Sequence, residues 1–185
     1  MAGENIEIVQ TFKYLGTVLD SKLNFSDNTD HITKKAQQRL RLLRTLSCFN
    51  VSKKALSMFY QAHICSILSF NISAWFGNLS LKNRNKLYNI FNAARKIIGN
   101  TQIPLGHIFV RAILKKTEKI LKTKKHPLNL EFILIPSQRR YKSPNTKTNR
   151  HKNSFVPLAI KLLAIKLLNR NKNNFPFYVI LYFEM

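Results

Sequence analysis

Acidic residues are scarce in this chain. Its 185 residues include 31 Lys and Arg but only 8 Asp and Glu, and no two aspartates are adjacent. Two-metal polymerases hold their ions with paired carboxylates, so a polymerase active site is not expected. Asp27 and Asp30 are better explained as helix-start residues, because the positive end of a helix dipole favours them.

Cysteines and the motifs of cofactor sites are also scarce. Cys48 and Cys65 are the only cysteines, and no metal-ligand spacing links them. We interpret both as reduced core residues of an intracellular protein. No histidine is followed two residues later by Asp or Glu, which leaves no sign of an iron-binding facial triad, and no glycine-rich dinucleotide fingerprint or P-loop occurs. We therefore expect a non-catalytic protein without metal or cofactor.

Long apolar runs are missing as well. The longest, Phe175–Phe183, is too short to span a bilayer. The first ten residues lack the basic start and apolar stretch of a signal peptide. We therefore expect an intracellular protein, cytoplasmic or nuclear, that is neither secreted nor bound to a membrane.

Positive charge is what the chain has in excess. The formal net charge is +23. Residues 1–31 contain two basic and five acidic residues, so residues 32–185 hold 29 basic and three acidic ones, a net +26. Such self-repulsion is relieved beside a polyanion, which favours a nucleic-acid partner. The alternative is a solvated basic surface without a ligand.

A strand and a tight turn are expected before the first helix. Residues 6–20 mix β-branched and aromatic residues around Gly16, which is typical of strand and turn. Ser, Asn, Thr and Asp at residues 26–30 then supply helix-start chemistry. An apolar stripe at helical period follows from Ile32. Arg39 falls inside this apolar arc, so its charged end is expected to reach round to solvent.

Two more helices are expected after the first. Ser52 is a good cap for a helix over residues 53–72, which is apolar around most of its circumference and so is expected to be central. Its His63 would lie on the core face as a hydrogen-bonded core group. Ser80 is expected to cap a third helix, with Gly99 at its end. Three such helices with short joints form a compact bundle.

The carboxy-terminal half is less regular. We expect a helix over residues 108–121, a basic loop or extended arm over 136–153, and a helix over 155–169. The pentapeptide AIKLL occurs twice in tandem in that last helix. A five-residue step is out of helical register, so the two copies cannot present the same face.

The expected fold class is therefore a mainly α helical bundle with a small amino-terminal β hairpin. Four segments are expected: a hairpin over 1–26, a three-helix bundle over 27–99, a basic helical and loop extension over 100–169, and an unstructured or appended tail over 170–185.

Basic and aromatic residues recur in these segments and suit phosphate contacts and base stacking. We expect Tyr141 to be free to stack on an unpaired base. The third helix opens with the same basic chemistry at Lys82, Arg84 and Lys86. The pattern indicates RNA or DNA bound without sequence specificity. The candidate nucleic-acid-binding residues are Lys13, Tyr14, Gly16, Lys34, Lys35, Arg39, Arg41, Arg44, Arg139, Arg140, Tyr141, Lys142 and Arg150.

The order of the motifs resembles that of the segment after the palm in LINE-type, non-LTR retrotransposon reverse transcriptases. The motifs are FKYLGTVLDSKLNFSDNTDHITKKAQQRLRLLRTL (12–46), FYQAHICSILSFNISAWFGN (59–78), LYNIFNAARKIIG (87–99) and PSQRRY (136–141). The resemblance implies that residues 12–16 form a primer-grip hairpin and that the helices form a thumb along the template–primer duplex. A separate polymerase palm fragment would then be a partner. The family pattern has Gly where Gln138 stands, and the AIKLL copy and the tail are not family features.

The same stretch also resembles the domain named after the amino-terminal region of the eighth AlkB homologue, an alkylated-nucleic-acid repair protein. The residues above support neither dioxygenase nor methyltransferase activity. The expected function is a non-catalytic, nucleic-acid-binding remnant of a retrotransposon reverse transcriptase. The alternatives are an AlkB-homologue-type domain with the repair activity, a truncated reverse transcriptase that completes a separate palm, and a translated relic with no selected role.

Overall fold

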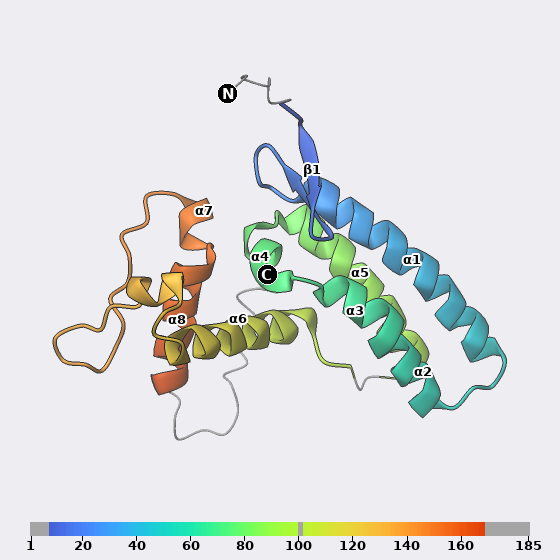
Figure 1. The fold of residues 1–185 in the computed structure, drawn as a ribbon. Coiled ribbons are helices and arrows are strands. Elements are labelled where there is room, and N and C mark those ends of the chain that lie inside the picture. Colours follow the sequence, from blue (N-terminus) through green and yellow to red (C-terminus); the bar gives the residue numbers. More distant parts are fainter. Residues whose placement is uncertain (1–7, 100–101, 169–185) are drawn as a thin grey trace.

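Helices build most of the chain (Figure 1). The computed structural model describes residues 8–99 and 102–168, and it is mainly helical with a two-stranded antiparallel hairpin at the amino-terminal end. The expected fold class is therefore confirmed. The tail expected at residues 170–185 lies outside the described residues. Among the described helices, none combines the length and the apolar character that crossing a membrane requires.

The hairpin pairs β1 (Thr11–Tyr14) with β2 (Thr17–Asp20). Its two turn residues, Leu15 and Gly16, have positive φ angles of 45° and 84°. Two positive angles give the turn a twist that matches the twist of the flanking strands. A backbone N–H of β2 donates to Oδ1 of Asn28 at 3.1 Å, which fixes the hairpin on the first helix. The expected strand and tight turn are confirmed.

Helix α1 (Ser26–Cys48) begins without a side-chain cap, so the helix-start role expected for residues 26–30 is wrong in that respect. Phe25 precedes the helix with a positive φ of 58°. The carboxylate of Asp20 orders this entry by accepting hydrogen bonds from three backbone N–H groups between β2 and α1. Thr29 is buried instead of capping, and its hydroxyl donates to the carbonyl of Phe25 at 2.8 Å.

The second helix contains one π-helical turn. Helix α2 (Lys53–Tyr60) runs through the π turn η1 (Gln61–Cys65) into α3 (Ser66–Ser69). Ser52 caps its start, as expected, by accepting a hydrogen bond from the N–H of Ala55 at 3.3 Å. The buried residues of this helix recur every four residues: Leu56, Tyr60, Ile64 and Leu68. In a regular helix of 3.6 residues per turn, residues at this spacing drift gradually around the axis. The wider π turn corrects the drift and keeps all four on the side that faces the core.

Two expectations about this helix are wrong. It is not central, since one side faces solvent and Met58 is 65% exposed there. His63 is exposed rather than on the core face, and its ring packs against Phe59 with the ring centroids 4.6 Å apart. In a regular helix His63 would follow Leu56 by about two turns on the same face. The π turn rotates it toward solvent.

Of the two cysteines expected in the core, only Cys65 is there. It is buried on η1, and burial raises the pKa of its thiol, so the side chain stays neutral. Cys48 ends α1 and is exposed, so the expectation is wrong for that residue.

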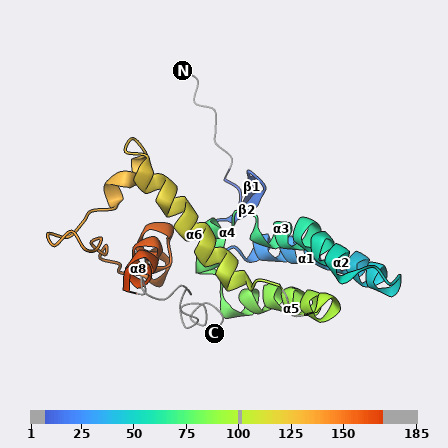
Figure 2. The ribbon, with the colours of Figure 1, turned by 90° about the horizontal axis from the view of Figure 1, so that it is seen from below.

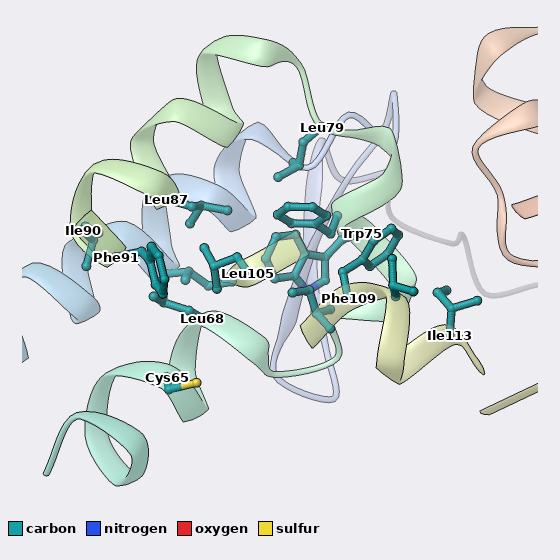
Figure 3. Close-up of a cluster of buried hydrophobic side chains, with 14 of the residues drawn as sticks. Cys65, Leu68, Trp75, Leu79, Leu87, Ile90, Phe91, Leu105, Phe109 and Ile113 are labelled. Atoms are coloured by element: carbon teal, nitrogen blue, oxygen red, sulfur yellow. The ribbon is translucent and has the colours of Figure 1, made fainter. Parts of the chain in front are cut away.

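Two aromatic residues that interrupt the helical pattern of the sequence belong to the core. Helix α4 (Ile72–Trp75) and the 3-10 turn η2 (Phe76–Asn78) carry Trp75 and Phe76, and both are fully buried. Figure 3 shows Trp75 within the buried hydrophobic cluster. The indole N–H of Trp75 donates to the carbonyl of Phe70 at 2.9 Å. A large aromatic can be buried this way because its one polar group has a partner.

Helix α5 (Leu81–Ile98) completes the bundle by packing along α1 (Figure 1). Ser80 caps its start, as expected, by accepting a hydrogen bond from the N–H of Asn83 at 3.3 Å. Gly99 ends it with a φ of 93°, and its N–H donates to the carbonyl of Arg95 at 2.8 Å. Both expected boundaries are therefore confirmed. Glycine suits the end of the helix because only glycine adopts this backbone conformation without strain.

A second group of helices extends from the bundle (Figures 1 and 2). Helix α6 (Leu105–Lys122) leads away from the bundle, and α8 (Phe155–Leu168) packs against it. Between them lie the 3-10 turn η3 (Pro127–Glu131) and the short helix α7 (Asn149–Lys152). Both long helices expected in this half are confirmed, and α6 begins three residues earlier than expected.

Close contacts join the two groups of helices. Phe109 of α6 is fully buried, and its ring centroid lies 5.0 Å from that of Phe76. At Gly77, an added Cβ would lie 2.7 Å from the carbonyl oxygen of Asn153. Only glycine therefore lets these two backbone segments approach.

The two AIKLL copies in α8 have different surroundings, as the sequence predicts. Ala159, Ile160 and Leu162 of the first copy are each exposed by 4% or less. Leu167 of the second copy is 42% exposed. Because five residues do not make a whole number of helical turns, the same letters meet core in one copy and solvent in the other.

The segment expected to be a basic loop is partly ordered by a β-bridge between Leu134 and Tyr141. Between them the N–H of Gln138 donates to the carbonyl of Ile135 at 2.8 Å. Gln138 has a positive φ of 53°, a conformation that favours glycine.

Candidate nucleic-acid interface

A groove between α1 and α5 gathers basic residues from both helices. It has a volume of about 680 Å³ and is lined by Lys34, Arg41 and Arg44 of α1 and by Lys86 of α5. Asp30 is the one acidic residue in its lining, so the lining carries a net charge of +3. We call this feature the α1–α5 groove.

Helical spacing aligns the α1 side of the groove. Lys34, Gln37, Arg41 and Arg44 follow one another at intervals of three or four residues, which places them on successive turns with Cβ atoms about 5–6 Å apart. All four side chains are exposed. Within residues 8–99 and 102–168, none of the three cations forms an ion pair. A row of unpaired cations at this spacing suits the phosphates of a nucleic-acid strand.

One ion pair crosses the groove. The ammonium of Lys86 on α5 donates to the carboxylate of Asp30 on α1. The pair ties the two helices together and leaves Lys86 beside the exposed cations of α1. Both partners are partly exposed, so the pair adds little to stability.

Two predicted residues of α1 lie outside the groove. Lys35 and Arg39 are exposed, and the end of Arg39 reaches solvent as expected for a charge beside the apolar stripe. Lys35 lines a smaller cavity of about 360 Å³ together with Gly16 and His31. Burial, followed by the charges of Lys35 and Lys13, lowers the pKa of His31. Lys35 therefore lines the cavity beside the hairpin turn and not the α1–α5 groove.

The hairpin offers two predicted residues to solvent and uses the third for packing. Lys13 is exposed and Tyr14 is 57% exposed on β1. Gly16 faces Phe70, whose ring would lie 3.0 Å from an added Cβ. The structure therefore gives Gly16 a role in seating the turn against the end of α3.

The predicted cluster at residues 139–142 is only partly available. Arg139, Arg140 and Lys142 are exposed. Tyr141 is half-buried, and its ring lies 5.8 Å from that of Phe132 at an angle of 86°. The expectation that Tyr141 is free for base stacking is therefore wrong, because its ring already packs against another aromatic ring.

Two other predicted cations make intramolecular contacts. The guanidinium of Arg150 donates to the backbone carbonyl of Lys22, which ties α7 to the region of the hairpin. The guanidinium of Arg84 donates to the carbonyl of Gly77 at 3.2 Å and lies 5.6 Å above the ring of Phe76. These contacts make both arginines parts of the packing.

The sequence does not indicate which basic residue of α5 lines the groove. Lys86 is one of three basic residues that open the third helix, and no feature of the sequence distinguishes it from Lys82.

The predicted binding residues also omit a second group of basic residues, on α6. His107, Arg111 and Lys115 recur every four residues, and this helical period is the signal that could have found them.

Residues 25–66 match the family described as "Alkylated DNA repair protein alkB homolog 8, N-terminal". The match covers 42 of the 185 residues, from the start of α1 to the end of the π turn, and so includes the α1 side of the groove. No curated protein and no solved structure matches the chain significantly. The match supports the resemblance to the AlkB-homologue domain. Nothing in these comparisons supports the resemblance to reverse transcriptases.

Proposed function

We propose that this chain is a non-catalytic module that binds the phosphate backbone of RNA or DNA. The observation that carries the proposal is the α1–α5 groove, where three exposed cations of α1 face Lys86 of α5. Phosphate contacts release counterions and supply most of the affinity of non-specific binding. The net charge of +23 adds a long-range attraction in the same direction.

The chemistry of the groove favours binding without sequence specificity. Lys and Arg contacts to phosphates fix the position of a nucleic acid but carry no sequence information. Specific reading needs side chains placed against base edges, and the groove lines up its cations along one helix instead. The proposed ligand is therefore a backbone, whatever its sequence.

The matched family agrees with a nucleic-acid partner. The name of this family is that of a protein of alkylated-DNA repair, and the matched residues supply the three α1 cations of the groove. We propose that this chain, like the protein for which the family is named, acts on a nucleic acid, and that the α1–α5 groove is where it binds. We assign it no repair chemistry.

A second candidate is a thumb-like element of a retrotransposon reverse transcriptase. The observation in its favour is that Lys13 and Tyr14 are exposed on the hairpin beside α1. This candidate predicts that the hairpin contacts a primer, so that Lys13→Ala would weaken binding to a primer–template junction more than to a blunt duplex. Equal weakening on both would exclude it.

The proposed function is tested by measuring binding at several salt concentrations. Arg41→Ala combined with Arg44→Ala removes two groove cations without touching the buried stripe. Each phosphate contact contributes about 0.9 to the slope of log affinity against log salt for duplex DNA. We expect the double variant to reduce that slope by about 1–2 and to bind about tenfold more weakly. Fluorescence anisotropy with the full chain and a labelled 20-base-pair duplex measures both quantities.

The matched control is Lys53→Ala combined with Lys54→Ala. Both lysines are exposed at the start of α2 and do not line the groove, so this variant loses the same charge elsewhere. We expect it to keep the parent's salt slope. Equal losses in the two double variants would show that net charge alone attracts the duplex, and the groove proposal would be wrong. Absence of binding of this duplex by the parent would exclude the groove as a duplex-binding site.

A further inference from the structure

A second cavity, of about 1080 Å³, lies between the π turn η1 and helix α6, with Lys166 of α8 at its border. We call it the α6 cavity. It is distinct from the α1–α5 groove because the two linings share no residue. This volume is slightly above the range of about 300–1,000 Å³ that is typical of pockets for small organic ligands. Its lining divides into three parts, each with its own chemistry.

The first part is an apolar wall beside a histidine ring. Ile103, Pro104 and Ile108 line the cavity, and Ile103 is 49% exposed although it is apolar. His107 precedes Ile108 in the first turn of α6, lines the cavity and is half-buried. Histidine rings are among the side chains on which unpaired bases stack. The wall therefore offers a flat, partly apolar surface to a planar ring.

The second part is a pair of amides held in a fixed orientation. Gln102 is only 7% exposed, and its amide N–H donates to the hydroxyl of Ser57 at 3.0 Å. Gln61 of the π turn in turn donates to the amide oxygen of Gln102 at 2.8 Å. Gln61 lines the cavity, and because its bond to Gln102 uses its amide N–H, its side-chain oxygen remains able to accept a hydrogen bond. Amide groups of this kind pair with the donors and acceptors on base edges.

The third part is cationic. Arg111 and Lys115 follow His107 at intervals of four residues, so the three stand on successive turns of α6. Both cations are exposed, and no ion pair holds either of them within the described residues. Glu118 is the one carboxylate in the lining, and it is bonded to Lys166 at 2.9 Å. Arg111 and Lys115 therefore remain for an anion.

We propose that the α6 cavity holds one unpaired nucleotide of a bound strand. The base would stack on His107 and the apolar wall, its edge would pair with the oxygen of Gln61, and its phosphate would contact Arg111 and Lys115. This proposal rests on nucleic-acid binding as the function, and it adds a preference for single-stranded ends or bulges. Proteins commonly recognise unpaired nucleotides by this combination of ring stacking and edge bonding.

The test compares three labelled ligands with the full chain by fluorescence anisotropy. They are a blunt 20-base-pair duplex, the same duplex with a five-nucleotide single-stranded tail, and the tailed duplex with abasic sites in the tail. The abasic tail keeps every phosphate and lacks the bases. We expect the normal tail to raise affinity about fivefold or more, as stacking of one base does. The abasic tail is expected to raise it far less.

Three variants assign the preference to the cavity. His107→Ala is expected to abolish the preference for the tailed duplex, and His107→Phe, which keeps a ring, is expected to restore it. Arg111→Ala combined with Lys115→Ala is expected to weaken binding of the tailed duplex more than binding of the blunt one. The matched control is Lys124→Ala with Lys125→Ala, two exposed lysines just beyond α6 that do not line the cavity. We expect this control to affect both ligands alike.

The outcomes separate this inference from the function on which it rests. Equal affinity for the normal and the abasic tail would overturn the nucleotide cavity and leave backbone binding intact. So would equal losses on blunt and tailed duplexes in the Arg111 and Lys115 variant. Binding of the tailed duplex without binding of the blunt one would overturn the role of the groove and support the cavity. If His107→Ala is less stable by thermal melting, the abasic comparison on the parent decides.

Discussion

The helical bundle, residues 26–99, and the connecting segment, residues 123–152, use positive charge in different ways. The segment is richer in basic residues, with eight Lys and Arg in its 30 residues against twelve in the 74 of the bundle. Yet the cations of the segment line none of the three cavities described above. The bundle, with fewer basic residues per length, forms the α1–α5 groove.

The difference follows from backbone regularity. In α1 the helical period returns every third or fourth side chain to one side, so Lys34, Arg41 and Arg44 share a groove. The segment has no such helical period at Gln138, where the backbone turns with a positive φ. Arg150 lies further along the segment, and its guanidinium donates to the backbone carbonyl of Lys22. A high density of basic residues in a sequence is therefore a weaker sign of a binding site than a basic stripe at helical period.

The two regions also differ in packing, which gives the largest expected effect. Trp75→Ala removes a fully buried ring and a hydrogen bond of 2.9 Å from the bundle. We expect a loss of about 3–5 kcal/mol in the free energy of unfolding, because the site cannot collapse around so large a cavity. Leu130→Ala in the segment, where Leu130 is 80% exposed, is expected to change it by less than about 0.5 kcal/mol.

Urea unfolding followed by circular dichroism measures both changes. If Trp75→Ala does not fold, Trp75→Phe keeps part of the ring and gives a smaller loss that can be measured. Similar losses at Trp75 and Leu130 would mean that the segment contributes to the core as much as the bundle does, contrary to its exposure.

The next prediction compares the charges of the two regions directly. Arg139→Ala with Arg140→Ala in the segment removes as much charge as Arg41→Ala with Arg44→Ala in the groove. We expect the groove pair to weaken duplex binding about tenfold and the segment pair only about two- to threefold, because dispersed cations add attraction without fixed contacts. Anisotropy titrations on one duplex measure the ratio. A larger loss from the segment pair would place the binding site on the segment.

A smaller effect is expected at the strained turn of the segment. Within 26–99 the non-glycine residues with positive φ are Asn50 and Asn71, and asparagine tolerates that conformation. The segment has Gln138 at a φ of 53° instead. Gln138→Gly is expected to raise the free energy of unfolding by about 0.5 kcal/mol, the relief of strain being partly offset by the entropy of the unfolded chain.

Gln138→Ala is the control for that effect. It shortens the side chain but keeps the Cβ, so we expect no gain in the urea midpoint. A gain as large as that of glycine would show that the side chain of Gln138, and not its backbone angle, is unfavourable. A loss in both variants would mean that the turn depends on a contact of the glutamine.

The smallest effect concerns the ion pair between α6 and α8, the helices that flank the segment. The hydrogen bond and charge of Lys166 lower the pKa of Glu118. A carboxyl with a lowered pKa stabilises the fold above its ordinary pKa, and this contribution is lost as the pH falls through the folded value. Both side chains are about half exposed, so the contribution is under about 1 kcal/mol.

Lys166→Met tests this pair. We expect the variant to be slightly less stable than the parent at pH 7 and equally stable near pH 3, where Glu118 is protonated in both. Urea unfolding at the two pH values measures the difference. A difference that persists unchanged at pH 3 would show that Lys166 acts through packing of its alkyl chain, as long charged side chains can.

Much of the local structure follows from the sequence, and the errors have physical causes. Ser52, Ser80 and Gly99 predict helix boundaries because capping depends on a few adjacent residues. His63 was placed on the wrong face because a π turn changes the phase of a helix, and no local motif announces such a turn. Tyr141 was expected to be free because its partner, Phe132, meets it only through a β-bridge.

The candidate site was predicted in part. The sequence identifies Lys34, Arg41 and Arg44 as basic residues of one helix, but it places Lys35 and Arg39 beside them with equal weight. In the structure α5 packs along α1 beside the three groove cations, whereas Lys35 lines the cavity beside the hairpin and Arg39 lines neither. Which cations converge is therefore decided by the neighbours of the helix.

The sequence by itself determined the helical class, the amino-terminal hairpin, the helix ends at Ser52, Ser80 and Gly99, and the excess of positive charge. These features depend on propensity, capping and period, which act within a few residues. The tertiary structure alone decided that Lys86 would face α1 across a groove and that Gln61 would meet Gln102 beside α6. Those pairs are 41 or more residues apart in sequence, and only the packing of a shared core brings such residues together.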